Sequence, residues 1–354
     1  MKDNYALSSL YFYLTWNCNL RCVHCWVEAG DHNSIGIKFE EVQGLLDQAV
    51  DKGLQHIRFT GGEPIIMWDT LHDIIQYTKD KGIVYDMETN LSLVNREKLE
   101  FLYKYDVALS VSVNGVTAEE HDTFSGCVGA FDKTITALKL MKDMGYKPNE
   151  IITCVSKETI PLLPERMKFF ETLGADRVKI NIIQNFGRAE DLNSENKLLG
   201  AKEQYELTQY IEELQKETDI FIYLDVPQCL QSFETFQKAG FGCCGIYNML
   251  CVLPDKKLSM CGHGSFEEEL VLCELQKETD LGETWEENPK LKKLRDAADT
   301  KYDGVCKNCI HFITCRGSCR IVAYRDSKTW NSSLPLCQQL YEEKIFPQSR
   351  LIEI

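Results

Sequence analysis

The sequence lacks the features that would point to a membrane protein or a nucleic-acid binder. Basic residues are in the minority, because 39 lysines and arginines stand against 54 aspartates and glutamates, a net charge of −15 over 354 residues. No sequence-wide positive field exists to attract nucleic-acid phosphates or an anionic membrane. No apolar run approaches the roughly 20 residues of a membrane span, and no signal peptide opens the chain. We therefore expect a cytoplasmic protein with no nucleic-acid and no membrane partner.

Internal repeats and low-complexity tracts are also missing, and the composition is that of an ordinary globular protein. The length suggests two domains, or one large barrel with an appendage. Such a chain buries a sizeable core without covalent cross-links. Sixteen cysteines are therefore the outlying feature. In an acidic chain without a signal peptide they indicate metal ligands or redox groups rather than disulfides.

Strand-like apolar runs alternate with helix-like patterns through the first two thirds of the chain. Alternating β and α elements predict a parallel sheet with right-handed crossovers. Apolar residues at helical spacing mark helices over residues 39–50 and 131–141, for example. Six units fall short of the eight of a full barrel, so we predict an α/β fold with a partial (β/α)6 TIM-like barrel. The predicted strands are Leu10–Thr15, Gln55–Thr60, Ile83–Thr89, Val107–Val113, Ile151–Val155 and Arg177–Ile183.

The composition shifts after a further helix and a strand expected at Ile220–Leu224. Beyond this strand the chain holds more than half of the cysteines and few long periodic segments. A region so rich in loops needs cross-links of some kind. We place a domain boundary between Val226 and Gly240, which divides the chain into a barrel domain, residues 1–230, and a small loop-rich domain, residues 231–354.

Three cysteines follow the first predicted strand at the spacing C-x3-C-x2-C: Cys18, Cys22 and Cys25. Thiolates are soft ligands that suit iron–sulfur clusters. Three of them can bind three irons of a four-iron cluster and leave the fourth iron open. The carboxyl end of a barrel strand is also where this architecture places its chemistry. The alternatives are a zinc site, which usually takes four ligands, or three reduced core cysteines.

This cysteine pattern resembles the signature of the radical S-adenosylmethionine (radical SAM) superfamily. The resemblance implies that SAM chelates the open iron. One electron from the reduced cluster then cleaves SAM to methionine and a 5′-deoxyadenosyl radical, which abstracts a hydrogen atom from the substrate. Relatives often place an aromatic residue just before the third cysteine, near the adenine, and His24 occupies that position.

A second match follows the second predicted strand, where Gly61, Gly62, Glu63 and Pro64 resemble the GGEP element of the same family. Glycines let the backbone approach a ligand closely. The resemblance implies that the Glu63 carboxylate and the Gly62 carbonyl bind the methionine ammonium group of SAM. A surface turn is the alternative for such a sequence taken alone.

Further candidates for SAM contacts stand at the ends of later strands. Ser112 and Asn114 end the fourth strand, where relatives place polar contacts to the SAM ribose or carboxylate. A strand-end turn also explains Asn114. Asn90 ends the third strand. Arg188 belongs to a Gly-Arg-Ala tripeptide after the sixth strand that recurs in relatives, although an ordinary loop arginine is the alternative.

The C-terminal region carries a second cysteine pattern, C-x2-C-x5-C-x3-C, with cysteines before and after it. The pattern resembles the SPASM extension of a subset of radical SAM enzymes, which carries two auxiliary four-iron clusters, each held by four cysteines. A zinc-ribbon-like module is the alternative. The resemblance implies Cys244, Cys251, Cys261 and Cys319 as ligands of the first auxiliary cluster, and Cys306, Cys309, Cys315 and Cys337 as ligands of the second.

One detail of this assignment stays open to choice, and one residue departs from the family pattern without weakening the ligand assignment. Cys244 is preferred over Cys243 because Cys244 precedes a glycine, as in the family's usual Cys-Gly start. Lys256 stands where relatives often have a glycine. We expect the cysteines outside the three ligand sets to be mostly structural: Cys127, Cys154, Cys229, Cys243 and Cys273.

Most relatives with this domain order modify a ribosomally made peptide, by a cross-link, a thioether, oxidation or epimerisation. The resemblance therefore implies a peptide-modifying enzyme with three four-iron clusters, SAM and a flavodoxin- or ferredoxin-type reductant. Many relatives carry an N-terminal domain that binds the leader peptide. Only 17 residues precede Cys18, so we expect a separate leader-binding protein, or a leaderless or small substrate. The alternatives are a radical SAM dehydrogenase acting on a small molecule or a tetrapyrrole precursor, and a non-catalytic electron carrier or scaffold.

Oxidation of a substrate after hydrogen abstraction also needs a base. Sulfatase-maturing relatives carry an acidic residue beside the cysteine that corresponds to Cys261. Here a glycine and His263 follow, which argues against a formylglycine-forming maturase. His263 is the candidate proton acceptor, since an unperturbed histidine has a pKa of about 6.5. A loop histidine hydrogen-bonded to water is the alternative.

Overall fold

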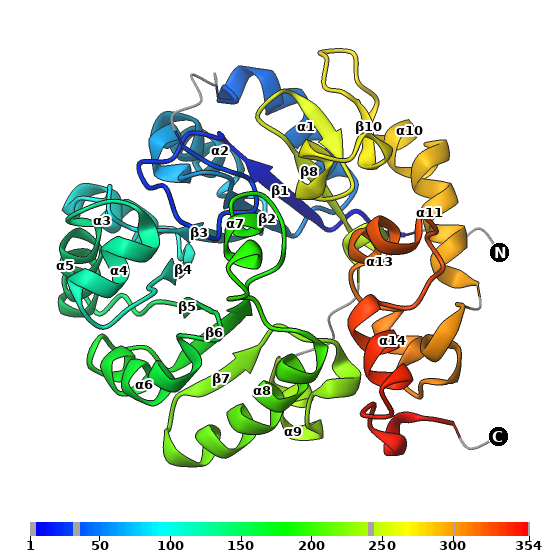
Figure 1. Cartoon of the computed structure of the whole chain (residues 1–354). Helices are drawn as coiled ribbons and strands as arrows, with labels where there is room; N and C mark the ends of the chain where they lie inside the picture. Colours follow the sequence, from blue (N-terminus) through cyan, green and yellow to red (C-terminus); the bar gives the residue numbers. More distant parts are fainter. Residues whose placement is uncertain (1–4, 31–35, 240–243, 301, 353–354) are drawn as a thin grey trace.

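A computed structural model describes residues 5–30, 36–239, 244–300 and 302–352. Its centre is a ten-stranded sheet in the order β10-β9-β8-β1-β2-β3-β4-β5-β6-β7. The strands from β1 to β7 are parallel and follow one another in an arc with helices on its outer side (Figure 1). These strands are β1 (Ser9–Tyr13), β2 (His56–Thr60), β3 (Val84–Thr89), β4 (Ala108–Ser112), β5 (Glu150–Val155), β6 (Arg177–Ile182) and β7 (Phe221–Leu224).

The predicted partial barrel is confirmed, since each predicted strand forms within two residues of its expected bounds. The helices expected from apolar periodicity also form, and the apolar residues of α1 that face the sheet are buried. The helices of this part of the chain are α1 (Phe39–Asp51), α2 (Trp68–Thr78), α3 (Arg96–Lys104), α4 (Ala118–Ser125), α5 (Ala130–Asp143), α6 (Leu163–Thr172), α7 (Ala189–Ser194) and α8 (Ala201–Leu214).

The alternation of side chains along β1 separates the core from the inner side of the arc. Successive residues of a strand point to opposite faces. Leu10 and Phe12 are fully buried, and the Phe12 ring stacks on Phe59 of β2 with ring centroids 6.3 Å apart. Tyr13, on the opposite face, points to the inner side, where it lines a cavity.

The sheet continues across the predicted domain boundary. β8 (Met249–Val252) pairs in parallel with β1, and the antiparallel strands β9 (Lys257–Ser259) and β10 (Val271–Glu274) extend that edge. Lys256, between β8 and β9, has a left-handed backbone with φ of +62°. This conformation favours glycine, which explains why relatives often have a glycine where this chain has a lysine.

The C-terminal helices lie at the open side of the arc, and α14 packs beside α8 (Figure 1). A small core of their own, which includes Ala201 and Leu340, joins these two helices. Within the described ranges, no helix combines the length and the apolar character that crossing a membrane requires. The helices are α9 (Phe233–Ala239), α10 (Leu281–Glu286), α11 (Pro289–Asp299), α12 (Phe312–Cys315), α13 (Arg320–Ser327) and α14 (Pro335–Glu342).

Candidate active site

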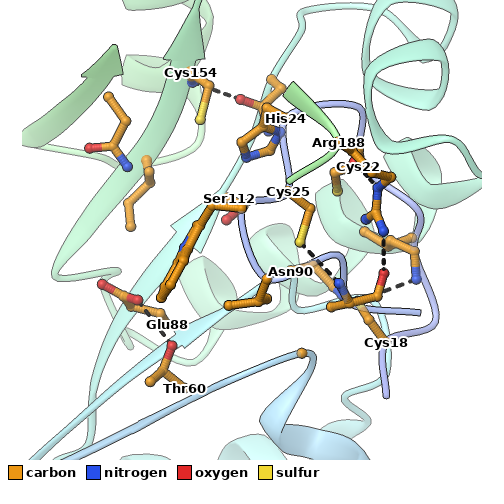
Figure 2. A pocket seen from close by; sticks show the side chains of 18 of the residues that line it. Cys18, Cys22, His24, Cys25, Thr60, Glu88, Asn90, Ser112, Cys154 and Arg188 are labelled. Atoms are coloured by element: carbon orange, nitrogen blue, oxygen red, sulfur yellow. Dashed lines mark hydrogen bonds between the residues drawn. The ribbon is translucent and has the colours of Figure 1, made fainter. Parts of the chain in front are cut away.

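A cavity of about 360 Å³ lies at the carboxyl ends of the parallel strands, the end where barrels of this kind carry their chemistry. Figure 2 shows part of its wall. The cavity brings together nearly all of the residues predicted to bind the first cluster and SAM, and it also includes the predicted base. Those that line it are Cys18, Cys22, His24, Cys25, Gly61, Gly62, Glu63, Asn90, Ser112, Asn114, Arg188 and His263. Pro64 is buried at the start of the short 3-10 helix η1 (Pro64–Met67) and does not line the cavity.

The cysteine loop, residues 14–30, is held in place by other segments. Two of its backbone amides donate hydrogen bonds of 2.8 and 3.0 Å to carbonyls at the end of α4. Arg188 donates from Nε to the carbonyl of Cys22 at 2.8 Å and from Nη1 to that of Ala29 at 2.9 Å. A Cβ at Gly187, where φ is +56°, would lie 2.7 Å from a carbonyl oxygen of this loop. The Gly-Arg pair therefore positions the cysteine loop.

The cysteine sulfurs accept hydrogen bonds from the backbone of their own loop. Sγ of Cys18 accepts from the amide of Leu20 at 3.4 Å, and Sγ of Cys25 accepts from the amide of Ala29 at 3.3 Å. Burial raises the pKa of the Cys18 thiol to about 12 and also raises that of Cys22. The positive charge of bound iron is what would make thiolates of them. Three thiols, two of which accept a backbone amide hydrogen bond at the sulfur, fit an iron–sulfur cluster.

The GGEP turn lies directly against the cysteine loop. The amide of Gly62 donates to the carbonyl of Thr15 at 2.7 Å, and the amide of Glu63 donates to that of Asn17 at 2.9 Å. A Cβ at Gly62 would lie 2.0 Å from the Asn17 carbonyl oxygen, and Gly61 has a φ of +125°. Glycine is therefore required at both positions, because any larger residue would separate the two loops.

Glu63 is 1% exposed, and its carboxylate joins three segments. Its Oε1 accepts from the hydroxyl of Thr89 at 2.8 Å and from the amide of Ile65 at 3.1 Å, and its Oε2 accepts from the amide of Asn90 at 2.9 Å. Burial raises the pKa of Glu63 to about 7, although these hydrogen bonds oppose the rise. Because a carboxylate has about four acceptor positions, one remains on Oε2 for a ligand.

The two predicted asparagines also hold the walls of the cavity. Nδ2 of Asn90 donates to Oδ1 of Asn19 at 3.1 Å and contacts the Cys18 sulfur at 3.8 Å. Oδ1 of Asn114 accepts from the amide of Cys154 on β5 at 2.8 Å. Both side chains therefore shape the cavity whether or not they also touch SAM.

Four polar side-chain atoms of cavity residues are buried without a hydrogen-bond partner among the described residues. They are Nδ1 of His24, Nε2 of His121, Oδ1 of Asn181 and Nδ1 of His263. The four residues share the wall of one cavity, and because an unsatisfied buried polar group costs about 1–3 kcal/mol, this wall favours a polar ligand. The amino, carboxylate, ribose and adenine groups of SAM meet this requirement. Burial lowers the pKa of His24 to about 4, so a neutral ring faces such a ligand at pH 7.

A second cavity, of about 280 Å³, is lined by Cys244, Cys261 and Cys319. Cys251 is the fourth predicted ligand of the first auxiliary cluster. It lies close enough to the Cys261 thiol to raise the pKa of that thiol. Burial raises the pKa of the Cys319 thiol, and the backbone at the start of α13 opposes this rise. This set fits a four-cysteine cluster, while Cys243 lies outside the described residues.

A third, small cavity of about 20 Å³ is lined by the four cysteines predicted to hold the second auxiliary cluster, and also by Cys229. Across the described ranges, no three His, Cys, Asp or Glu side chains converge closely enough to hold one metal ion. In a four-iron cluster, by contrast, each cysteine binds a different iron.

Several cavity residues escaped the sequence analysis. Glu88 of β3 accepts a hydrogen bond from the hydroxyl of Thr60 at 3.1 Å (Figure 2), and Asp225 directly follows β7. Both stand at strand ends, and this position is the signal by which sequence analysis could have identified them. His121 on α4 and Cys154 on β5 also line the cavity, and no motif marked them. Asp225 and His263 line both the first and the second cavity.

Replacing Glu63 by Gln should remove a pH dependence of stability. The pKa of Glu63 rises from 4.5 to about 7 on folding, so between these values the folded chain binds more protons than the unfolded chain. The wild-type free energy of unfolding should therefore fall, relative to that of the variant, by up to about 3 kcal/mol as pH rises through this window. Urea unfolding of the iron-free proteins measures it. Parallel pH curves for the two proteins would contradict the burial argument.

Comparison with known proteins agrees with this site. Residues 12–165 match the family model of the radical SAM superfamily. The AdoMet-dependent heme synthase of Oleidesulfovibrio alaskensis is 26% identical over 342 residues, which cover 92% of this chain and 85% of that protein. The mycofactocin maturase MftC of Mycobacterium ulcerans is 23% identical over 341 residues, which cover 95% of this chain and 89% of that protein.

Solved structures show the same fold over nearly the whole chain. Streptococcus suis SuiB bound to S-adenosylmethionine has a TM-score of 0.73 at 18% identity, covering 94% of this chain and 78% of that one. SuiB bound to the precursor peptide SuiA has a TM-score of 0.72 at 19% identity, covering 94% and 76%. The expected fold, a TIM-like barrel with a SPASM-like C-terminal extension, is thereby confirmed. Residues 12–165 of this chain are therefore a radical SAM domain.

Proposed function

We propose that this chain is a radical SAM enzyme that modifies a ribosomally synthesised peptide. The observation that carries the proposal is the first cavity, where the cysteine triad, the GGEP turn and four unpartnered polar atoms meet at the strand ends. When bound, a four-iron cluster and SAM supply the reductive cleavage of SAM to a 5′-deoxyadenosyl radical, which takes a hydrogen atom from the substrate.

The chain's own residues bind and orient these groups. Cys18, Cys22 and Cys25 would hold the cluster. The Gly62 carbonyl and the remaining acceptor position of Glu63 would bind the methionine ammonium group. The neutral ring of His24 would lie near the adenine. Polar contacts to the SAM ribose and carboxylate would come from Ser112, Asn114 and Asn90, and Arg188 would keep the cysteine loop in position.

The charge of the first cavity favours a peptide over an anionic substrate. Among the described lining residues, the acidic ones are Glu63, Glu88 and Asp225, and Arg188 is the sole lysine or arginine. The guanidinium of Arg188 already donates to two loop carbonyls. A tetrapyrrole precursor carries several propionate carboxylates, and burying an unpaired carboxylate is costly. A peptide segment needs no such cation, and SuiB was solved with a precursor peptide.

A tetrapyrrole-modifying enzyme is the second candidate, because relatives that match 92% of this chain are heme synthases. At 26% identity with one of these relatives, the substrate-facing residues are free to differ. We therefore infer the substrate class from the charge of the cavity rather than from the substrate of the relatives. Both candidates need a flavodoxin- or ferredoxin-type reductant. A peptide substrate could be delivered by a separate leader-binding protein, or could add as a strand to a sheet edge at β7 or β10.

A proton acceptor is needed where the two larger cavities meet. His263, the acceptor predicted from sequence, packs on Trp26 with ring centroids 4.6 Å apart. Burial lowers the pKa of His263 to about 4, because accepting a proton would turn the ring into a buried cation, whereas Asp225 would lose its charge on accepting one. Asp225 lines the same two cavities and lies 3.9 Å from Nζ of Lys179. We therefore propose Asp225 as the acceptor, with His263 as the alternative.

The three-cluster assignment predicts an iron stoichiometry. Anaerobically reconstituted protein should hold about twelve iron atoms per chain, four for each cluster, and should form 5′-deoxyadenosine after reduction. Replacing Cys18, Cys22 and Cys25 together by Ala should lower the iron content to about eight and abolish SAM cleavage. Iron analysis and chromatography measure both. Unchanged SAM cleavage in the triple variant would refute the radical SAM mechanism, and about four iron in the wild type would remove the auxiliary clusters.

The substrate is tested with two probes under the same reducing conditions. A short peptide encoded beside the gene should change mass, and the triple cysteine variant is the control that must leave it unchanged. A propionate-bearing iron porphyrin should show no saturable change in its Soret band on titration, because the described residues of the cavity wall include no lysine or arginine besides Arg188. Saturable binding followed by conversion of the porphyrin would instead favour the second candidate.

Two single variants identify the proton acceptor. Asp225→Asn should lower product formation by about a hundredfold or more while 5′-deoxyadenosine formation continues, because hydrogen abstraction precedes proton loss. His263→Gln should keep product formation within about tenfold of the wild type. Product and 5′-deoxyadenosine are quantified in the same reaction. The opposite ranking of the two variants would assign the proton to His263.

A further inference from the structure

The cavity lined by the four cysteines predicted to hold the second auxiliary cluster contains a fifth thiol, one more than four irons need. Cys229 lies in the short 3-10 helix η4 (Gln228–Leu230), directly after β7, and is buried. Its Sγ lies 3.6 Å from Sγ of Cys337. Cys309 also lies near enough to influence the pKa of the Cys229 thiol. No sequence pattern indicates the contact between Cys229 and Cys337, because Cys229 stands outside every recognised cysteine spacing.

The contact between two of these thiols has a geometric consequence. Each iron of a four-iron cluster takes one cysteine. The sulfurs of Cys229 and Cys337, in contact at 3.6 Å, lie at the position of one iron, which we call one corner of the site. They cannot bind two different irons without separating. We propose that Cys229 and Cys337 are alternative ligands for the same iron of the second auxiliary cluster. The inference rests on the proposed function, which supplies that cluster.

The space between the five thiols supports alternative rather than joint ligation. It amounts to about 20 Å³, room for about one water molecule. A cluster can therefore enter only as the thiols turn outward. Four thiols complete the ligand set, so once either Cys229 or Cys337 binds the shared iron, the other is left beside it without an iron.

The two competing thiols come from different parts of the fold. Cys229 follows the last parallel strand of the barrel, whereas Cys337 belongs to α14 near the end of the chain. The helices α14 and α8 pack together, and both contribute to the core that contains the two cysteines. Ligation by Cys229 would anchor the cluster directly to the barrel, and ligation by Cys337 would anchor it to α14. An inert buried cysteine, the reading made from sequence, would contribute no ligand.

The test removes each thiol alone and then both. The background is the variant in which Cys18, Cys22 and Cys25 are Ala, so that only auxiliary clusters remain. A four-iron cluster with an iron that lacks a cysteine loses that iron on mild oxidation and gives the EPR signal of a three-iron cluster. Alanine is used because a serine oxygen can itself bind iron. Iron content and the EPR signal after ferricyanide treatment are the readouts.

Either single variant, Cys229→Ala or Cys337→Ala, should keep about eight iron and give less than about a tenth of a spin per chain as three-iron signal. The double variant should give about one spin per chain. Cys306→Ala is the matched control, because Cys306 lines the same cavity and no second thiol is assigned to its corner. It should give the full signal as a single variant. A full signal from Cys337→Ala alone would overturn the proposal.

Failure of the three-cluster assignment would look different. A background variant with about four iron has no second auxiliary cluster, and the proposal then falls with it. Retention of the first auxiliary cluster serves as the folding control. A double variant that keeps those four irons and its far-ultraviolet circular dichroism is folded, so a three-iron signal reports a lost ligand. A double variant without any three-iron signal would also refute the proposal.

Discussion

The contact between the cysteine loop and the GGEP turn is the constraint on which the rest of the site depends. Two backbone hydrogen bonds of 2.7 and 2.9 Å join the loops that follow β1 and β2. They can form because Gly62 has no Cβ to meet the Asn17 carbonyl. Glu63 then binds the end of β3 through Thr89 and Asn90. Three strand ends are thereby fixed before any cofactor is bound, which is the preorganisation that a reactive intermediate requires.

This arrangement buries polar groups, which lowers the stability of the protein. The same buried groups indicate where a ligand binds. The fold leaves buried, unpartnered nitrogens on His24, His121 and His263, and it raises the pKa of Glu63 to about 7. Each feature lowers the stability of the empty protein. Their gathering in one cavity is explained by a ligand that satisfies them. Stability and function therefore oppose one another at this site, as at many active sites.

Much of this could be predicted from the sequence, for a physical reason. Strand positions follow from apolar runs and glycine stops, and motifs such as C-x3-C-x2-C act through residues close together in the chain. Contacts between distant segments could not be predicted in this way. His121 on a helix, Cys154 within a buried strand and Cys229 after β7 carry no local signal. These residues reach the cavities because of the order of the strands in the sheet. No local sequence pattern indicates which residues that order brings together.

Asp225 and His263 connect the first cavity with the second. Both line the first cavity, where the radical chemistry would begin, and the second, where Cys244, Cys261 and Cys319 gather. The sheet itself continues from β1 into β8, so the second cavity is built on a strand that pairs with the strand before the cysteine loop. A substrate in the first cavity would therefore sit beside the wall that the auxiliary site shares. Proton removal at this wall suits an oxidation more than a redox-neutral change, because oxidation after hydrogen abstraction must release a proton as well as an electron.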